Sequence, residues 1–180
     1  MPFNPKGRSI MANTIILFSS ANQTGNTYQL TQAVRSQLDE THTRYFNLDS
    51  HNYADYNYHN FYSRDDFYDI ADALAWADNI VFASPVYWHG VTSNMKRLID
   101  RITELTENPE IKHIGKGLKD KQGFVLTTSA SKDVCPVFAG FFEKVFHYFD
   151  IHMTELLHLD CSKSFTLPKQ QITHFSALLK

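Results

Sequence analysis

Residues 14–27 read TIILFSSANQTGNT, a short apolar run followed by a polar turn. The apolar run at 14–18 stops at Ser19, as expected for a strand that is covered on both faces of a sheet. Beyond the turn, apolar residues recur at intervals of three and four, which predicts a helix with one face packed against that sheet. These residues are Leu30, Ala33, Val34 and Leu38. A strand, a polar turn and a helix in immediate succession indicate an α/β fold.

The same alternation continues along the rest of the chain. Further strands are predicted at 44–48, 80–83, 123–128 and 154–159. Further helices are predicted at 66–76, 92–105, 137–149 and 170–179. Because β–α units of this kind are joined by right-handed crossovers, we expect a doubly wound parallel sheet with helices on both faces.

The length and composition fit one globular domain. The chain has 180 residues, of which 43% are hydrophobic and 20% are charged, the balance of a protein that folds around one core. We expect a single domain over 13–180, preceded by a loose extension at 1–12. Residues 1–10 are rich in polar side chains and carry two prolines, and Met11 offers a second possible start.

Charge and hydropathy exclude several classes of partner. The formal net charge is −2, with lysine and arginine scattered along the chain, so we expect no nucleic-acid partner. No apolar run approaches the roughly 20 residues that span a bilayer, and residues 1–10 lack the apolar core of a secretory signal. These features predict a cytoplasmic protein with no membrane partner. None of the nine histidines lies in a ligand spacing such as HExxH, so we predict no metal.

The two cysteines, Cys135 and Cys161, are too far apart in sequence to form a CxxC motif. Intracellular cysteines are usually reduced, and a free cysteine often behaves as a small buried hydrophobe. We interpret both residues in that way.

The turn after the first strand, at 20–27, is a candidate anion site. A turn that starts a helix presents free backbone amides and the positive end of the helix dipole. Hydroxyl and amide side chains add further donors, and Gly25 lets the backbone approach an anion closely. These side chains belong to Ser20, Asn22, Thr24, Asn26 and Thr27.

The pattern of this turn favours one kind of anion. It contains neither GxGxxG nor GxxxxGK(S/T), so a dinucleotide or a nucleoside triphosphate is poorly supported and a monophosphate fits better. Polar residues that only cap the helix would give the same pattern. The turn alone leaves both interpretations open.

A second turn follows the strand predicted at 80–83. It holds a proline and two large aromatic residues at the carboxyl end of a strand, where side chains border ligands. The residues at 88–90 are typical of a turn whose amides can meet the oxygens of a ligand. Together these features suit the border of a flat ring system. The residues concerned are Pro85, Val86, Tyr87, Trp88 and His89.

On these motifs, over nearly all of 13–180, the chain resembles the flavodoxin-like NAD(P)H-dependent FMN reductases and quinone reductases. TGNT at 24–27 resembles their FMN phosphate loop. SPVYW at 84–88, followed by NMKRLIDR at 94–101, resembles the reductase signature more closely than that of electron-carrier flavodoxins. The resemblance implies bound FMN, a transient NADH or NADPH co-substrate, and a five-stranded sheet in the order 2-1-3-4-5.

The resemblance also assigns residues to the flavin. Positions 20–27 should hold the phosphate, and 85–89 should border the isoalloxazine, with amides near Trp88 and His89 facing its pyrimidine oxygens and N1. A third loop should follow the strand predicted at 123–128. It should consist of Thr128, Ser129 and Ala130.

Two departures from the family pattern concern these loops. His89 stands where such reductases often have glycine, so either its imidazole tunes the flavin potential or only its backbone is used. Residues 128–131 read TSAS where many relatives have a glycine-rich turn, which leaves the shape of the third loop open. The chain also lacks the cysteine cluster of iron–sulfur flavoproteins, so electrons would leave directly from the flavin.

A stretch at 45–68 is unusually rich in aromatic residues. It could line a substrate site or a subunit contact, or it could pack over its own sheet edge. The aromatic residues are Tyr45, Phe46, Tyr53, Tyr56, Tyr58, Phe61, Tyr62, Phe67 and Tyr68. Relatives of this kind commonly form dimers, so we expect a homodimer or higher homo-oligomer, with contacts from this stretch and from the helix at 92–105.

The resemblance implies an oxidoreductase in which a nicotinamide passes hydride to FMN and a small acceptor, such as a quinone or another flavin, then takes its place. The flavin carries the chemistry, so no catalytic residue is assigned. One alternative is a flavodoxin-type carrier that binds FMN without oxidising NAD(P)H, and another is a flavodoxin-fold protein that has lost its cofactor. Carriers are usually strongly acidic, so the nearly neutral charge of this chain favours the enzyme.

Overall fold

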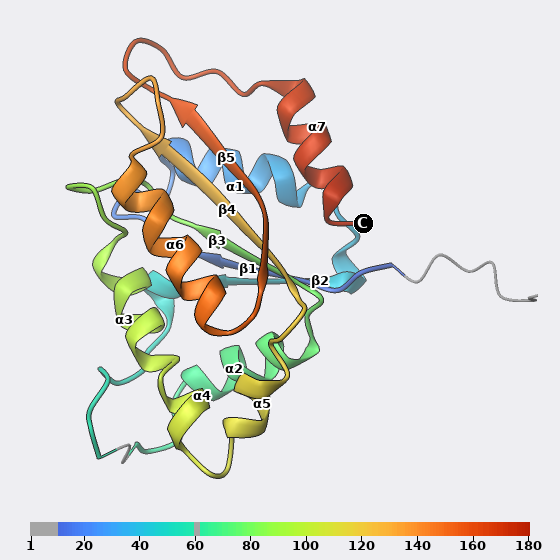
Figure 1. Cartoon of the computed structure of the whole chain (residues 1–180). Coiled ribbons are helices and arrows are strands. Elements are labelled where there is room, and N and C mark those ends of the chain that lie inside the picture. Colours follow the sequence, from blue (N-terminus) through green and yellow to red (C-terminus); the bar gives the residue numbers. More distant parts are fainter. Residues whose placement is uncertain (1–10, 60–61) are drawn as a thin grey trace, which may run out of the picture.

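The computed structural model describes residues 11–59 and 62–180 (Figure 1). Most of the extension expected at 1–12, and Phe61 of the aromatic stretch, lie outside the described residues. Among the described residues, no helix has the length and apolar character needed to cross a membrane.

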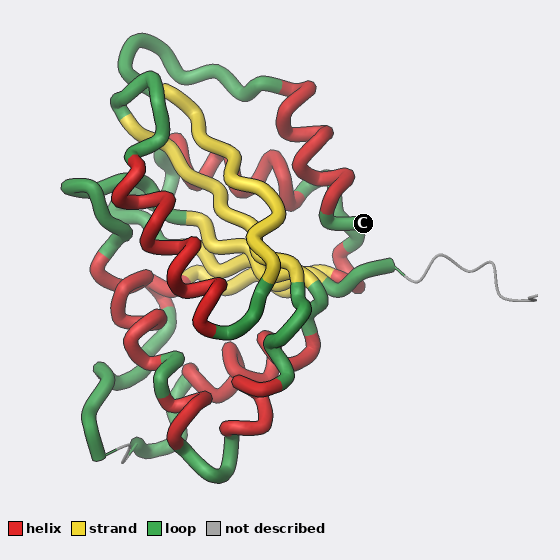
Figure 2. The backbone as a smooth tube through the Cα atoms, in the orientation of Figure 1, coloured by secondary structure: helices red, strands yellow, loops and turns green. Residues whose placement is uncertain are grey.

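Five parallel strands form one sheet at the centre of the fold (Figures 1 and 2). Their order across the sheet is β2-β1-β3-β4-β5, which confirms the predicted order 2-1-3-4-5. The strands are β1 (Thr14–Phe18), β2 (Thr43–Asn47), β3 (Asn79–Ala83), β4 (Gln122–Ser129) and β5 (His152–Asp160).

Helices cover both faces of this sheet (Figure 2). They are α1 (Asn26–Arg35), α2 (Phe67–Trp76), α3 (Ser93–Arg101), α4 (Glu104–Glu107), α5 (Lys112–Lys116), α6 (Pro136–Tyr148) and α7 (Lys169–Leu178). Two short 3₁₀ turns, η1 (Glu40–His42) and η2 (Leu48–Ser50), flank β2. The doubly wound α/β class predicted from the sequence is therefore confirmed.

Alternation along the strands builds two hydrophobic cores. Ile15 and Leu17 of β1 face the side where α2, α3 and α6 pack. Ile16 and Phe18 of the same strand face the side of α1 and α7. All four side chains are fully buried, because successive residues of a strand point to opposite faces and both faces are covered.

One predicted helix is wrong in its extent. The helix expected at 92–105 is divided into α3 and α4, with Thr92 acting as the N-cap by accepting a hydrogen bond from the amide of Met95 at 3.3 Å. The apolar period runs through the break without interruption, because Leu98 and Leu105 are both buried in the same core. Periodicity alone could not reveal this break. The other predicted strands and helices are confirmed, with ends shifted by a residue or two, except that α1 ends at Arg35 and Leu38 packs against the core from beyond it. The short helix α5 was not predicted.

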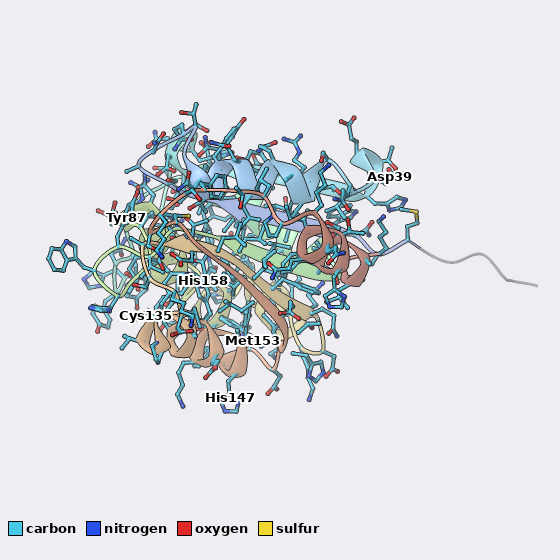
Figure 3. All side chains as sticks on the ribbon, turned by 90° about the horizontal axis from the view of Figure 1, so that it is seen from above. Asp39, Tyr87, Cys135, His147, Met153 and His158 are labelled. Carbon is cyan, nitrogen blue, oxygen red and sulfur yellow. The ribbon has the colours of Figure 1, made fainter. Side chains whose placement is uncertain are left out.

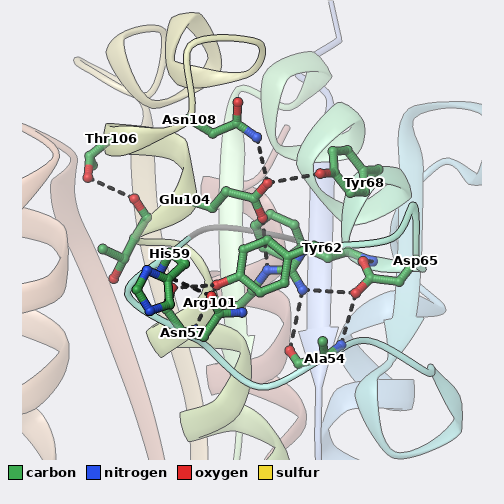
Figure 4. Close-up of polar contacts among 12 residues, drawn as sticks. Ala54, Asn57, His59, Tyr62, Asp65, Tyr68, Arg101, Glu104, Thr106 and Asn108 are labelled. Carbon is green, nitrogen blue, oxygen red and sulfur yellow. Dashed lines mark hydrogen bonds and ion pairs between the residues drawn. The ribbon is translucent and has the colours of Figure 1, made fainter.

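The aromatic stretch is fastened to α3 and α4 by the buried side chain of Arg101 (Figure 4). Arg101 Nε donates to Glu104 Oε2 at 2.8 Å, and Nη1 donates to Asp65 Oδ2 at 2.9 Å. The guanidinium carbon is 3.3 Å from the ring centroid of Tyr62. The aromatic stretch therefore packs on its own chain, and it does so mainly against α3 and α4 rather than against the sheet edge. Within the stretch, Tyr58 is 89% exposed.

The carboxyl ends of three neighbouring strands are joined by backbone hydrogen bonds that continue beyond the sheet. The amide of Ser19 donates to the carbonyl of Ala83 at 3.0 Å, which links the turns after β1 and β3. The amide of Val86 donates to the carbonyl of Thr128 at 3.1 Å, which links the turn after β3 to β4. These bonds hold the three turns side by side at one edge of the sheet.

Candidate functional site

Three loops meet at the carboxyl edge of the sheet. We call them the first loop (19–25, after β1), the second loop (84–92, after β3) and the third loop (130–135, after β4). Figure 3 shows Tyr87 of the second loop and Cys135 of the third at the same end of the molecule, opposite Asp39. In open α/β sheets, this edge is where ligands bind.

The first loop is held by Asp49, a residue of η2 that the sequence analysis missed. Asp49 Oδ2 accepts hydrogen bonds from the amide of Ser20 at 2.8 Å and from Gln23 Nε2 at 3.0 Å. Its Oδ1 accepts from Ser19 Oγ at 3.0 Å and from Asn94 Nδ2, at the start of α3, at 2.7 Å. One carboxylate therefore fixes the first loop against the beginning of α3. Its place directly after a strand, at the same edge as the loop, was the available sequence signal.

The first turn of α1 has no side-chain cap. The N-cap residue is Gly25, which has no side chain to accept a capping hydrogen bond. The first amide that donates a helical hydrogen bond is that of Gln29, to the carbonyl of Gly25 at 3.0 Å. The amides at 26–28 therefore have no hydrogen-bond acceptor within the helix. The interpretation that polar residues merely cap this helix is wrong. Free amides at a helix N-terminus are suited to an anion.

The side chains of the first loop divide into two groups. Asn22 Oδ1 accepts from the Thr24 amide at 3.1 Å and from the Thr24 hydroxyl at 3.2 Å, so both residues lie at the surface in one local turn. A Cβ at Gly25 would come within 3.0 Å of Asn22 Cγ, which explains why glycine suits this close approach. Thr27 is buried instead, and its Oγ1 lies 2.7 Å from Thr128 Oγ1. Thr27 thus connects the start of α1 to the end of β4.

The second loop contains a tight turn in a left-handed conformation. Tyr87 and Gly90 exchange two backbone hydrogen bonds of 2.9 Å, with Trp88 and His89 between them. The φ angles of Trp88 and His89 are 49° and 65°, values that glycine or asparagine usually occupies in such turns. Each non-glycine residue held there costs about 1–3 kcal/mol, and strain of this kind gathers at functional sites.

The second loop also places large aromatic surface in solvent. Trp88 is 98% exposed and Tyr87 is 41% exposed, whereas Pro85 is buried. The backbone bonds of the turn use the amides of Tyr87 and Gly90, which leaves those of Trp88 and His89 for a ligand. The structure thus places Val86 against Thr128 but Trp88 clear of the other predicted site residues.

The third loop begins on a strand that is longer than expected. Thr128 and Ser129 are the last residues of β4, and Ala130 is exposed just beyond them. Ser129 Oγ lies 2.8 Å from His158 Nε2 on β5 and accepts from the amide of Ser131 at 3.2 Å. Burial lowers the pKa of His158, while the charge of Asp160 opposes this. His158 is a further residue that the sequence analysis missed.

The interpretation of the cysteines as buried hydrophobes is wrong in the degree of burial, although Cys135 does pack against the hydrophobic core. Cys135 and Cys161 are free thiols, and each is partly exposed. Cys135 Sγ lies 3.2 Å from His89 Nδ1, so the imidazole of His89 contacts the third loop. The carboxyl edge thus carries an uncapped helix, a strained aromatic turn and a thiol–imidazole pair.

Comparisons with known proteins place the chain among flavin-dependent oxidoreductases. The family model for NADPH-dependent FMN reductase matches residues 12–138, more than half of the chain. YwqN of Bacillus subtilis (strain 168), named as an NAD(P)H-dependent FMN-containing oxidoreductase, is 26% identical over 90 residues. That match covers 47% of this chain and 48% of YwqN, so it spans about half the length of the curated relative.

Solved structures share the fold at low sequence identity. The Trp repressor binding protein from Bacillus subtilis has a TM-score of 0.70 at 16% identity, with 93% of this chain and 98% of that chain covered. An FMN-dependent NADH-azoreductase from Bacillus anthracis, solved in complex with FMN, has a TM-score of 0.65 at 10% identity, with 93% and 99% covered. These likenesses confirm the flavodoxin-like fold.

Proposed function

Because the chain belongs to the NADPH-dependent FMN reductase family, we propose that it is an FMN-dependent NAD(P)H oxidoreductase acting on a small acceptor such as a quinone or another flavin. The observation that carries this proposal is the meeting of three loops at the carboxyl edge, one of which leads into α1 and leaves the amides at 26–28 outside the helical hydrogen-bond pattern. A monophosphate suits amides to which no side chain in the described part of the chain is bonded.

The residues at this edge fit FMN. Within the described part of the chain, Asp49 is the one residue whose carboxylate is bonded to the first loop. This carboxylate accepts four hydrogen bonds there and is therefore largely occupied. The amides at 26–28 supply donors to a phosphate without a lysine or arginine. The exposed Thr24 hydroxyl donates to Asn22 Oδ1 at 3.2 Å and would turn from it to a bound phosphate. The amides of Trp88 and His89 offer donors for the polar edge of a ring system.

The protein contributes binding and orientation. The first loop would hold the phosphate, while Pro85, Val86 and the turn at 87–90 would border the isoalloxazine, and Thr128, Ser129 and Ala130 would close its third side. When bound, FMN supplies the hydride-accepting atom, N5. No side chain of the chain has to donate a proton or act as a nucleophile for hydride transfer, so the catalytic assignment stays open.

The aromatic surface of the second loop indicates which class of acceptor the protein could bind. Tyr87 and Trp88 present apolar rings to solvent next to the proposed flavin position. A flat aromatic acceptor can stack on such surfaces. This supports quinones and flavins over aliphatic acceptors, and it leaves NADH and NADPH as equal candidates for the donor.

The chain also offers a surface for self-association, and we propose a homodimer or higher homo-oligomer. Residues of α3, α4 and α6, and of the segments that follow α3 and α6, line an apolar groove. Part of this groove lies in the region 92–105, where we expected subunit contacts. The groove is lined by Ile99, Ile102, Thr103, Thr106, Phe141, Lys144, Val145, Tyr148 and Phe149. Light scattering on the purified chain tests this, and a monomer at micromolar concentration would contradict it.

Anaerobic reduction of the purified protein tests the enzymatic function. A yellow protein whose flavin absorbance bleaches promptly with NADPH or NADH supports a reductase. Colour that persists with either nicotinamide, and is lost only with a partner reductase, supports the electron-carrier alternative. A colourless protein that neither quenches free FMN nor gains thermal stability with it contradicts both flavin functions.

A further inference from the structure

The thiol of Cys135 and the imidazole of His89 are in contact, and neither side chain takes part in the proposed hydride transfer. The two residues are 46 positions apart, yet His89 Nδ1 and Cys135 Sγ lie 3.2 Å from each other. His89 is exposed and Cys135 is partly exposed, so small reagents can reach both. A thiol in contact with a base and open to solvent has the arrangement of an activated nucleophile.

The position of Cys135 at the start of α6 strengthens this arrangement. Cys135 is the N-cap residue of this 13-residue helix. The sulfur of Cys135 does not accept a well-formed capping hydrogen bond. The backbone amide of Phe138 is nevertheless close enough to favour the thiolate form of Cys135. Together with His89 and the amide of Val137, this lowers the pKa of the Cys135 thiol. Among the described residues, His89 is the one titratable side chain that contributes to this shift.

Cys161 provides a contrast within the same chain. It is also free and partly exposed, but its Sγ donates to the carbonyl oxygen of Leu159 at 3.6 Å. A carbonyl oxygen cannot take the proton from a thiol, whereas an imidazole can. The two cysteines therefore share their degree of exposure and differ in their chemical surroundings.

The turn that carries His89 gives the contact a geometric origin. Trp88 and His89 both adopt left-handed backbone angles, and the turn is closed by two backbone hydrogen bonds. In this conformation the imidazole of His89 contacts the third loop while the Trp88 indole stands in solvent. The strained turn thus directs a base to Cys135.

We propose that Cys135 is a nucleophilic thiolate assisted by His89, and that it is the modification site at which hydrogen peroxide oxidises this protein. The thiolate attacks one peroxide oxygen, so an S–O bond forms as the O–O bond breaks. Sulfur is oxidised to a sulfenic acid, and the peroxide is reduced. The leaving hydroxide takes the proton that His89 has accepted from the thiol, which gives water. Hydrogen peroxide is small and neutral, so this step needs no preformed pocket.

The first test compares the two cysteines in the purified, full-length wild-type chain. Alkylation by iodoacetamide is followed at each cysteine by peptide mass spectrometry over a range of pH. For each unit by which one thiol pKa is lower, the thiolate fraction rises about tenfold and its nucleophilicity falls about threefold, which leaves a net gain of about threefold. We expect Cys135 to react faster than Cys161 at neutral pH, by about threefold for each unit that separates the two measured midpoints. Equal rates and midpoints would overturn the proposal.

The second test separates His89 from general access. His89→Ala should slow alkylation of Cys135 and raise its midpoint, while the rate at Cys161 stays unchanged. His147→Ala is the matched control, because His147 is an exposed histidine in the last turn of α6, at the opposite end of that helix from Cys135. An unchanged profile for Cys135 in His89→Ala, in a chain whose circular dichroism matches the wild type, would refute the role of His89.

The third test uses hydrogen peroxide itself. Treatment at low molar excess, followed by dimedone, should label Cys135 ahead of Cys161, and Cys135→Ser should remove the main labelled peptide. His89→Ala should lower the rate of labelling. Label distributed evenly between the two cysteines, or found mainly on Cys161, would reject Cys135 as the modification site. None of these readouts depends on FMN, so this proposal and the reductase function can fail separately.

Discussion

Replacing Arg101 by methionine is expected to destabilise the fold strongly, because the guanidinium is fully buried among charged partners. Arg101 is 0% exposed, as is Glu104, whose carboxylate lies 2.8 Å from Arg101 Nε. Methionine fills much of the space but leaves the Glu104 carboxylate buried without its cation. Breaking a buried pair in this way costs about 3–5 kcal/mol, a large share of the about 5–15 kcal/mol that stabilises a typical domain.

The contact with Asp65 adds a second consequence. Asp65 holds the aromatic stretch through Arg101 Nη1, at 2.9 Å, and the Tyr62 ring covers the guanidinium. Arg101→Met therefore also releases residues of that stretch from α3. We expect faster proteolysis there in addition to the loss of global stability.

Urea unfolding, followed by circular dichroism, measures the effect. With a urea m-value of about 2 kcal/mol/M, a loss of about 4 kcal/mol moves the midpoint down by about 2 M. Lys96→Ala on the same helix is the matched control. The Lys96–Asp100 pair has side chains 50% and 46% exposed, and an exposed pair of this spacing contributes only about 0.3–0.5 kcal/mol.

A double variant tests the mechanism. Arg101→Met combined with Glu104→Gln removes both charges, so it should lose less stability than the sum of the two single variants. Additive losses would mean that the two side chains act independently. A loss below about 1 kcal/mol in Arg101→Met would refute the view that the buried charge holds this region together.

Three further predictions concern the loops, the core and pH. Thr24→Val should weaken FMN binding by about tenfold or more and riboflavin much less, because only FMN carries the phosphate. Fluorescence titration measures both, with Thr173→Val, at an exposed position in the middle of α7, as control. Gly123→Ala should lower the melting temperature, since its Cβ would lie 2.8 Å from the Phe146 ring, whereas Gly140→Ala, with open space around it, should raise stability by about 0.5–1 kcal/mol. Burial lowers the pKa of His158 in the folded state. The stability that neutral His158 contributes is therefore present above about pH 6.5 and is lost as the pH falls through its folded pKa. In His158→Gln, the urea midpoint should fall less steeply over this pH range.

Each of these has an outcome that would contradict it. Equal weakening of FMN and riboflavin by Thr24→Val would remove the phosphate from the first loop. A melting temperature unchanged in Gly123→Ala would show that Phe146 moves aside without cost. A pH profile unchanged in His158→Gln would mean that other groups set the acid sensitivity.

The sequence was most informative where one short segment carried the whole signal. The run at 14–18 is buried on both faces, and its continuous apolar character predicted this. The break between α3 and α4 was missed because the buried side of both helices follows one period. The burial of Arg101 was also beyond reach, because it depends on Asp65, which is 36 positions away in the chain.

The candidate site shows the same division. The first and second loops were predicted because each carries its own turn chemistry. Asp49, His158 and the pairing of Cys135 with His89 were missed, since their contacts join segments that are 29 to 46 positions apart. Contacts of this kind follow from strand order, which periodicity cannot supply.

Among the described residues, four non-glycine residues have left-handed backbone angles, and two of them, Asp120 and Asp150, precede β4 and β5 at the opposite edge of the sheet. The other two lie in the second loop, at the carboxyl edge, where a tryptophan is held in solvent. Local strain persists where surrounding contacts enforce it, and here the Thr27–Thr128 and Val86–Thr128 contacts hold the three loops together. Loops fixed in this way bind a ligand without the cost of ordering them, which is why this edge is the site to test first.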